Sequence, residues 1–464
     1  MHPSDVQFVV GLSGYFVKDL QAVRQSPTYD PLIDNIRPQT PGFKSVVQAG
    51  QAISILIHLP NGTIALGDCA DVIFSGAASR DPLFIAEEHL PILESVVKPR
   101  LLTCDVTQFR QNAIVMDGPW PELQHAKLHS AVRYGITQAL LAATALVHRC
   151  TMAEIISREW GTALSRHPID ILASCHRNDH LQLDRMIMKR VPMLPHASFV
   201  HVHDIGPKGQ ALIDYIEIVS QRVQERGSPG YRPRLHFDVY GTIGDLFPDN
   251  ETLVSFLGQL QRSAQPYDLL IESPIIEPTQ SEQIRRLTNL RQLLRQRSIQ
   301  VQIVADEWCN TLEDIRKFAD AGAVDYVQIK MPDLGGVQNS IDAVLYCQDK
   351  GVGCCLGGSA NETEVSARVT AHVALATKPM SVHKLVFWEF QDDCKQPEEF
   401  ISNILVAVAV ELLDFFPVAS HYVWMGPIVL GEEFHDIVKF DIVAKSGQDL
   451  NRTQRSVAIV DTLF

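Results

Sequence analysis

Short apolar runs alternate with amphipathic segments from about residue 169 onward, a pattern typical of parallel β/α units. Helical patterns follow the apolar runs, around residues 181–190, 209–226, 250–263, 279–296, 311–320, 336–349, 361–375 and 397–414. Eight such repeats over about 250 residues match the count and length of a (β/α)8 TIM-type barrel. The sequence therefore predicts an α/β fold whose barrel strands are Asp170–Ser174, Val191–His196, Leu235–Val239, Leu269–Glu272, Val301–Asp306, Tyr326–Lys330, Val352–Leu356 and Val382–Phe387.

The first part of the chain does not alternate in this way. Gln51–Leu59 and Thr63–Leu66, joined by Asn61-Gly62, predict a β-hairpin. Asp81–Val97 and the Ala- and Leu-rich Ala131–Leu146 favour helices. We therefore expect an N-terminal α+β capping domain over residues 1–165, the barrel over 166–418, and a tail of unassigned role over 419–464 that contains a strand-like segment at 436–443.

The polar, glycine-bearing segment Gly67–Phe84 links the hairpin to the first helix. Such a loop is suited to lie over a site, although an ordinary connection is the alternative.

Composition and charge narrow the class of protein. The chain has 464 residues, of which 46% are hydrophobic and 20% charged, as in soluble globular proteins. A formal net charge of −14 argues against a nucleic-acid or anionic-membrane partner. An anionic substrate would be repelled by this field, so local cations must hold it.

The nine cysteines show no CxxC or Cys/His ligand spacing, and Cys354-Cys355 lies in an apolar run. Scattered thiols in a long chain indicate a reduced, cytoplasmic protein. The first residues lack the pattern of a signal peptide, and no segment approaches transmembrane length.

Polar residues close the predicted strands, where barrel enzymes place their chemistry. Asp238, Glu272 and Asp306 end three consecutive strands. Three convergent carboxylates repel one another unless a cation lies between them, and an all-oxygen ligand set suits Mg²⁺. The remaining ends carry Ser174, His196, Lys330 and the loop Gly357-Gly358-Ser359-Ala360.

Lys330 follows the third acid by one strand, and His196 precedes the first by one strand. They would flank a metal and could exchange a proton next to a carboxylate, with the metal neutralising the enolate. A structural Lys330–Asp306 ion pair and a core role for His196 are the alternatives. Gln328 shares the face of Lys330, because strand side chains alternate.

Three further histidines and the glycine loop complete this interpretation. His236 shares a face with Asp238 and could support a ligand or simply pack, whereas His201 and His203 are expected in a solvent-exposed loop. The Gly357-Gly358 pair lets backbone approach a ligand, and amides before a helix could bind a substrate carboxylate. Alone, such a pair is weak support for a site.

Eight blocks of the sequence stand out: GDCADVIFSGAASRDPLF, RYGITQALL, MLPHA, FDVYGTIG, IESP, VADEWCNT, VQIKMPDLGGV and GGSANETEVSA. These blocks resemble methylaspartate ammonia-lyase, a branch of the enolase superfamily, and the resemblance runs from the N-terminus to about residue 378. The resemblance implies a capped barrel, bound Mg²⁺ with K⁺ as activator, a homodimer, and reversible loss of ammonia from L-threo-3-methylaspartate to give mesaconate. It places Asp238, Glu272 and Asp306 on Mg²⁺, Lys330 as base for the threo isomer, His196 as its counterpart, and Gln328, Ser174, Ser359 and Ala360 next to substrate.

The chain departs from the family where substrate would bind. Ile73 and Ser174 stand where glutamines are usual, GGSANE replaces GGTCNE, Cys355 replaces an aromatic residue, and the usual KPGMG segment after residue 379 is absent. We expect weaker binding of methylaspartate and tolerance of a bulkier C3 or nitrogen substituent, unless the altered segment 380–394 supplies the missing contacts. An enolase-superfamily racemase or dehydratase, or a non-catalytic paralogue, is the alternative to a carbon–nitrogen lyase.

Overall fold

The computed structural model describes residues 1–25 and 36–384. The predicted helix around 397–414, the strand-like segment 436–443 and the tail lie outside the described residues.

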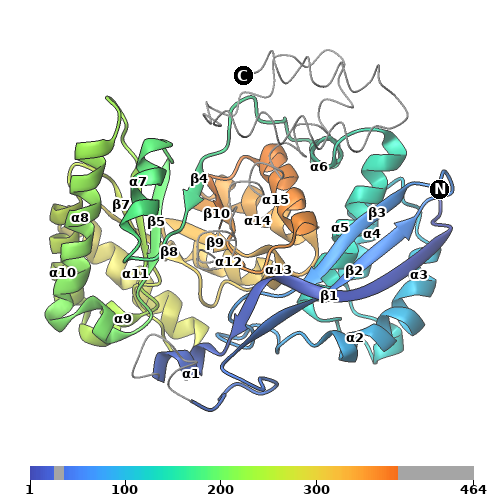
Figure 1. Ribbon diagram of the computed structural model, residues 1–464, viewed down its shortest axis with the longest axis horizontal. Coiled ribbons are helices and arrows are strands. Elements are labelled where there is room, and N and C mark those ends of the chain that lie inside the picture. The colour runs from blue at the N-terminus through green and yellow to red at the C-terminus, as the bar shows by residue number, and fades with distance from the viewer. Residues whose placement is uncertain (26–35, 385–464) are drawn as a thin grey trace. The chain divides into compact units, whose positions relative to one another are not determined.

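The predicted barrel is confirmed (Figure 1). Its parallel strands close in the order β10-β11-β4-β5-β6-β7-β8-β9. Most predicted boundaries hold within two residues, and β5 starts and ends two residues later than expected, so that it runs past His196. The strands are β4 Ile171–Ala173, β5 Met193–Ser198, β6 Arg234–Asp238, β7 Leu269–Glu272, β8 Val301–Ala305, β9 Tyr326–Ile329, β10 Gly353–Gly357 and β11 Ser381–Lys384.

The helices between these strands begin where side chains cap them. Asp249, Thr279 and Thr311 each accept a hydrogen bond from the backbone N–H three residues later, which satisfies a donor that the helix leaves open. The helices are α7 His180–Met188, α8 Gln210–Arg226, α9 Thr242–Leu246, α10 Asn250–Ala264, α11 Gln280–Gln296, α12 Leu312–Asp320, α13 Met331–Leu334, α14 Val337–Asp349 and α15 Glu364–Thr377, with 3₁₀ turns η3 Val202–Ile205 and η4 Pro207–Gly209.

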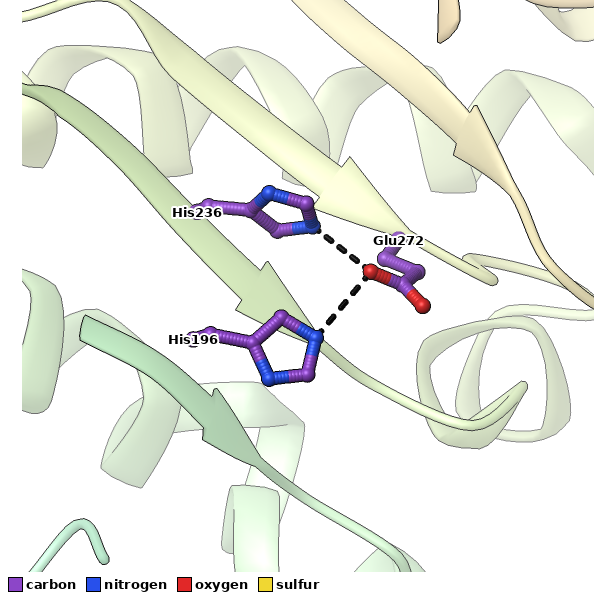
Figure 2. A group of neighbouring side chains, drawn as sticks. All are labelled: His196, His236 and Glu272. Atoms are coloured by element: carbon purple, nitrogen blue, oxygen red, sulfur yellow. Dashed lines mark hydrogen bonds and ion pairs between the residues drawn. The ribbon is translucent and has the colours of Figure 1, made fainter. Parts of the chain in front are cut away.

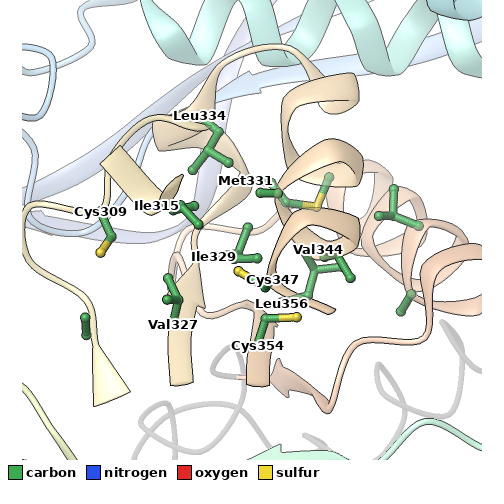
Figure 3. Packing of buried hydrophobic residues seen from close by; sticks show 14 of the residues in the cluster. Cys309, Ile315, Val327, Ile329, Met331, Leu334, Val344, Cys347, Cys354 and Leu356 are labelled. Carbon is green, nitrogen blue, oxygen red and sulfur yellow. The ribbon is translucent and has the colours of Figure 1, made fainter. Parts of the chain in front are cut away.

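Alternation along the strands separates the barrel's two faces. Val327 and Ile329 of β9 point outward and join the core that includes Val344 of α14 (Figure 3). Gln328, between them, therefore points into the barrel. An apolar layer fills part of the barrel interior and consists of Leu172, Met193, Leu270, Val304, Tyr326 and Cys355.

The N-terminal part is an antiparallel sheet in the order β1-β2-β3, covered by α5. The predicted hairpin is confirmed as β2 Val47–His58 and β3 Ile64–Ala70, whereas the long edge strand β1 Asp5–Lys18 was not predicted. Glycines bring helix and sheet together, because a Cβ on Gly67 would lie 2.2 Å from the Gly135 carbonyl oxygen.

The predicted helix Asp81–Val97 starts only at Ala86, because Asp81 serves other contacts: its carboxylate accepts from the Ser130 N–H and its carbonyl from the Gly76 N–H. The N-terminal helices are α1 Leu20–Gln25, α2 Ala86–Ile92, the π-helical turn η1 Leu93–Val97, α3 Lys98–Leu102, α4 Phe109–Asp117, the 3₁₀ turn η2 Pro121–Leu123, α5 Ser130–His148 and α6 Met152–Trp160.

Among the described residues, no single helix has the length and apolar character to cross a membrane. Helices α5 and α6 meet that test only together, with a 94° bend between them.

The loop 71–85 lies against the carboxyl-terminal ends of the barrel strands, as a covering loop would. The Ile73 N–H donates to the Ser359 carbonyl at 3.0 Å. The Asn310 side chain, beyond β8, donates to the Ala78 carbonyl. These contacts bring N-terminal side chains to the end of the barrel where its chemistry would lie.

Candidate active site

Three buried carboxylates lie at neighbouring strand ends, as the sequence predicted. Asp238 and Glu272 are the last residues of β6 and β7 and stand opposite each other in the sheet register. Asp306 follows the last residue of β8, the next strand around the barrel.

The negative charges of these neighbouring acids make ionisation of Asp238 and of the adjacent Glu307 less favourable. Burial, followed by the charges of Glu272, Glu307 and Asp306, raises the pKa of Asp238 well above its usual value. Burial and Asp306 likewise raise the pKa of Glu307. Five buried carboxylates thus face two buried cations, Lys330 and Arg80, in the described part of this region: Asp238, Glu272, Asp306, Glu307 and Asp333. A divalent cation with oxygen ligands fits this excess of negative charge.

Glu272 is also held by two histidines (Figure 2). Its Oε2 lies 2.7 Å from His236 Nε2 and 3.2 Å from His196 Nε2. Burial opposes ionisation of Glu272, but the two rings outweigh burial and hold its pKa well below the usual value. His236 has the supporting position that the sequence left open. Ligand atoms of these three residues lie within 4.8 Å of one another, so the group could also hold a metal ion.

Lys330 lies on the other side of the acids. Its Nζ donates to Asp306 Oδ2 at 2.5 Å. Burial lowers the pKa of Lys330, but the charges of Asp306, Glu272 and Glu307 together outweigh burial, and the net shift is upward.

Arg80, from the loop over the barrel, was missed by sequence reasoning. Its Nη2 is 3.2 Å from the other oxygen of Asp306, and its Nε donates to Asp333 at 2.8 Å. Burial raises the pKa of Asp333 to about 6 despite this partner. The available signal was a single arginine in the block that resembles the family.

A polar chain joins Gln328, Ser174 and His196 through a histidine that sequence reasoning did not single out. His383 of β11 lies 2.6 Å from Gln328 Nε2 and 2.8 Å from Ser174 Oγ. Ser174 Oγ is 3.2 Å from His196 Nδ1. The signal was the alternation along the predicted strand Val382–Phe387, which turns His383 to the face opposite the apolar Val382.

The glycine loop differs from its predicted position at a helix start. The Ser359 N–H donates to Glu362 Oε1 at 2.7 Å, so it does not point a free amide into the site. Helix α15 starts only at Glu364 and is capped by its own Thr363. Ala360 is buried in a left-handed conformation with φ of 64°.

The remaining sequence-predicted positions lie outside this cluster. His201 is buried rather than solvent-exposed, because its Nε2 bonds to the Val23 carbonyl at 2.5 Å; His203 is exposed. Cys355 packs in the apolar layer of the barrel. The Ile73 side chain packs against an apolar cluster that includes Phe74, and its backbone N–H donates to the Ser359 carbonyl.

Backbone strain gathers at the same end of the barrel. Non-glycine residues with positive φ follow or end several strands: His196 at 36°, Tyr240 at 42°, Ser273 at 48° and Trp308 at 67°. A register shift between Pro195 and Ala197 makes His196 the extra residue of a bulge, which re-aims its ring. Such conformations persist where surrounding contacts enforce them, often at functional sites.

Two side chains that can transfer a proton are hydrogen-bonded to different acids of the cluster. Lys330 bonds to Asp306, and His196 bonds to Glu272. This geometry suits acid–base chemistry on either face of a carbon next to a carboxylate.

Comparisons with known proteins agree with this geometry. Residues 1–161 match the family model described as methylaspartate ammonia-lyase N-terminus, and residues 163–384 match methylaspartate ammonia-lyase C-terminus. Methylaspartate ammonia-lyase 1 of Carboxydothermus hydrogenoformans is 43% identical over 380 residues, which cover 82% of this chain and 90% of the relative.

Two solved structures share the fold over most of this chain. The Citrobacter amalonaticus methylaspartate ammonia lyase containing (2S,3S)-3-methylaspartic acid gives a TM-score of 0.81 at 39% identity and covers 88% of this chain and 99% of its own. The Mg-complex of β-methylaspartase from Clostridium tetanomorphum gives 0.79 at 35% identity, covering 89% and 99%. With the two family models matched over residues 1–161 and 163–384, and a relative 43% identical over 82% of its length, the chain belongs to the methylaspartate ammonia-lyase family.

Proposed function

We propose that this protein catalyses the reversible loss of ammonia from L-threo-3-methylaspartate, or a related 3-substituted aspartate, giving mesaconate or its analogue. The observation that carries the proposal is the placement of Lys330 and His196 beside a convergent acid cluster. The family membership and the methylaspartate in the Citrobacter relative support the substrate class.

In this proposal Lys330 Nζ takes the C3 proton of the threo isomer. The electron pair left on C3 is shared with the adjacent carboxylate and then expels the amine from C2, which forms the double bond. His196 faces the other side of C3 and handles the proton of the erythro isomer. Both groups are buried, so water is largely excluded from the proton transfers.

Asp238, Glu272 and Asp306 would hold Mg²⁺, the ion named for the Clostridium relative. Bound there, Mg²⁺ would supply positive charge to the substrate carboxylate as negative charge develops on it. Activation by K⁺, a homodimeric assembly and a cytoplasmic location remain predictions from the sequence.

Gln328, Ser174 and the Ser359-Ala360 loop are proposed to contact the substrate. Gln328 and Ser174 are buried and bond to the same histidine, so they could act on neighbouring substrate groups. Because the Ser359 N–H is engaged by Glu362, the loop's contribution would come from its other polar groups.

Two measurements on the same reaction test the proposal directly: the release of ammonia and the rise in ultraviolet absorbance of the conjugated diacid product. We expect activity with 3-methylaspartate and Mg²⁺, silence in EDTA, and recovery when Mg²⁺ is restored. Asp238→Asn, Glu272→Gln and Asp306→Asn should each remove most activity. Mg²⁺ gives up part of its hydration shell when it binds, and the charges of all three carboxylates are needed to offset that loss. Full activity in chelator would contradict the metal assignment.

A racemase-type activity is the second candidate, because Lys330 and His196 could act on opposite faces of one carbon. Proton NMR in deuterated water separates the two. A lyase releases ammonia together with exchange at C3, whereas a racemase or epimerase inverts the centre and leaves the amine in place.

The substrate is further proposed to differ from methylaspartate in size. Ile73 offers no hydrogen bond and Ser174 is short, so methylaspartate would lose about 1–3 kcal/mol for each unpaired polar group. Kinetics across C3- and N-substituted aspartates, for the wild type and an Ile73→Gln/Ser174→Gln double variant, test this idea. An unchanged preference for methylaspartate in both proteins would exclude it.

A further inference from the structure

A second group of metal-ligating side chains lies away from the acid cluster, in the turn that follows β5. In the described part of the chain, two groups of three histidine or acidic side chains have ligand atoms that all lie within 4.8 Å of one another. One is the group around Glu272, and the other consists of His201, His203 and Asp204. The proposed lyase reaction and its Mg²⁺ ion use none of the residues of this second group.

A closed turn brings these three side chains together. The His201 N–H donates to Asp204 Oδ2 at 3.0 Å, and the Asp204 N–H donates to the His201 carbonyl at 2.9 Å. The two bonds fix the start of the turn η3. The rings of His201 and His203 stack with their centroids 4.9 Å apart and their planes 25° apart. The local sequence HVHD is therefore sufficient to place all three side chains at one point.

The two buried members of the group are held from outside by further hydrogen bonds. His201 Nε2 donates to the Val23 carbonyl of α1 at 2.5 Å, since a carbonyl oxygen only accepts. Asp204 Oδ1 accepts from Arg177 Nη2 at 2.7 Å. Imidazoles and carboxylates that bind a metal are typically oriented by outer partners of this kind. These bonds leave His201 Nδ1 turned toward Asp204.

The contacts inside the group are longer than the contacts that surround it. His201 Nδ1 lies 3.3 Å from Asp204 Oδ2, and His203 Nε2 lies 3.6 Å from Asp204 Oδ1. Direct hydrogen bonds between charged groups are usually about 2.7–2.9 Å long. A tetrahedral ion with bonds of about 2.0–2.2 Å instead holds its ligand atoms about 3.3–3.6 Å apart. The spacing therefore matches ligands around an ion better than direct ion pairs.

The donor set and its exposure define the class of ion. Two imidazole nitrogens and a carboxylate favour Zn²⁺ and similar divalent transition metals, whereas Mg²⁺ prefers oxygen ligands. The side chains of His201 and Asp204 are 3% and 2% exposed, but that of His203 is 55% exposed. An ion can thus enter from solvent, and water can complete its ligands. The charge of Arg177 offsets part of the attraction of Asp204, so we expect a weaker site than one with four protein ligands.

We propose that His201, His203 and Asp204 form a second metal site, which takes Zn²⁺ or a similar divalent transition metal and is separate from the acid cluster. An ion bound there would fix the turn after β5 to α1, because His201 also bonds to the Val23 carbonyl. Val23 packs in one apolar cluster with Tyr240, which lies just beyond β6. The ion would therefore stabilise the contact of α1 with the carboxyl-terminal end of the barrel. The proposal does not depend on the lyase reaction.

Calorimetric titration of the EDTA-treated and dialysed protein with Zn²⁺ in excess Mg²⁺ tests the proposal. We expect the wild type to bind Zn²⁺ under these conditions. His203→Ala removes the exposed ligand and leaves the buried contacts intact, so it should fold normally. It should weaken Zn²⁺ binding at least about tenfold, the smallest effect typical of losing even an outer partner. His167→Ala removes an exposed histidine outside the group and should bind Zn²⁺ like the wild type.

Binding of Zn²⁺ at the group around Glu272 would give a different result. His203→Ala would then bind Zn²⁺ like the wild type, whereas Glu272→Gln would bind it more weakly, and the second site would be refuted. A wild type that takes up no Zn²⁺ in excess Mg²⁺ would refute it as well.

Thermal unfolding gives a second readout that needs no activity. An ion that binds only the folded chain raises its Tm. Zn²⁺ should therefore raise the Tm of the wild type and of His167→Ala more than that of His203→Ala. Equal shifts in all three proteins would overturn the proposal.

Discussion

Lys330 and Asp306 form a buried ion pair, and Asp306 is the strongest of the charges that favour the protonated lysine. The 2.5 Å ion pair is buried, and Arg80 binds the remaining oxygen of the same carboxylate. A lysine in this setting is held in place and oriented, yet its raised pKa opposes its use as a base until Asp306 is engaged elsewhere. A cation held by Asp306 would weaken that ion pair, so the metal and the base are coupled through one side chain.

Lys330→Ala tests the base. Loss of a general base lowers turnover of the threo substrate by about 10²–10⁴-fold, while Mg²⁺ affinity is retained because the carboxylates remain. His196→Asn should instead mainly affect the erythro isomer and deuterium exchange on its face of C3. Stopped assays measure the turnover of the threo and erythro isomers by each variant. Lys350→Ala, which removes a more exposed lysine outside the site, is the control. Wild-type turnover by Lys330→Ala would remove the residue from this role.

At the scale of elements, the loop 71–85 attaches the N-terminal sheet to the barrel through a buried charge. Both ion pairs of Arg80 have side chains less than 5% exposed. Removing one member of such a group leaves an uncompensated charge, whereas removing two can restore balance.

Arg80→Met should therefore cost about 3–5 kcal/mol of unfolding free energy. Adding Asp333→Asn should recover part of that cost, because the stranded carboxylate is then neutral. Urea unfolding of the single and double variants gives the coupling energy. Lys350→Met, which breaks an exposed pair with Asp320 at 2.8 Å, should cost under about 1 kcal/mol and serves as the control. Equal costs at the two sites would contradict a buried network.

His89 in helix α2 should make the stability of the protein depend on pH. His89 stacks on Phe84 with ring centroids 4.9 Å apart, and burial, followed by His129, lowers its pKa to about 4. The unfolded chain binds the proton near pH 6.5 and the folded chain does not. The contribution of neutral His89 to the free energy of unfolding is thus complete above about pH 6.5 and is lost as the pH falls toward 4.

His89→Phe keeps the stack but cannot titrate. The wild type should lose more unfolding free energy than the variant between pH 7 and pH 5, measured by urea titration at each pH. Parallel losses in the two proteins would show that other groups cause the decline.

The same elements show what the sequence could predict. The barrel strands, Asp238, Glu272, Asp306 and Lys330 follow from local alternation and from polar residues at strand ends. Arg80 and His383 could not be placed this way, because their partners lie far along the chain and depend on how loops and strand ends meet. The late start of α2 has the same cause, since Asp81 is engaged by tertiary contacts. Roles of the site residues stay predictions until variants are measured.

At the scale of the whole molecule, the formal net charge of −14 opposes capture of an anionic amino acid. The two cations of the site are buried and already paired with carboxylates, so they do little to offset the long-range field. Salt screens charges over about 10 Å at 0.1 M ionic strength. Substrate capture should therefore improve as ionic strength rises, the reverse of an enzyme that attracts its substrate electrostatically.

The measurement is kcat/KM for 3-methylaspartate at fixed Mg²⁺ with increasing tetramethylammonium chloride, a salt that avoids confusion with activation by K⁺. We expect a modest rise, about twofold, between 0.02 and 0.2 M, because repulsion between distant charges is weak and already partly screened. Replacing several exposed glutamates with glutamine, such as Glu313 and Glu364, should raise kcat/KM at low salt and flatten the salt dependence. A steep fall with salt would show that a local cationic path outweighs the global charge. The substrate would then be drawn in by side chains at the barrel's open end and not merely held there.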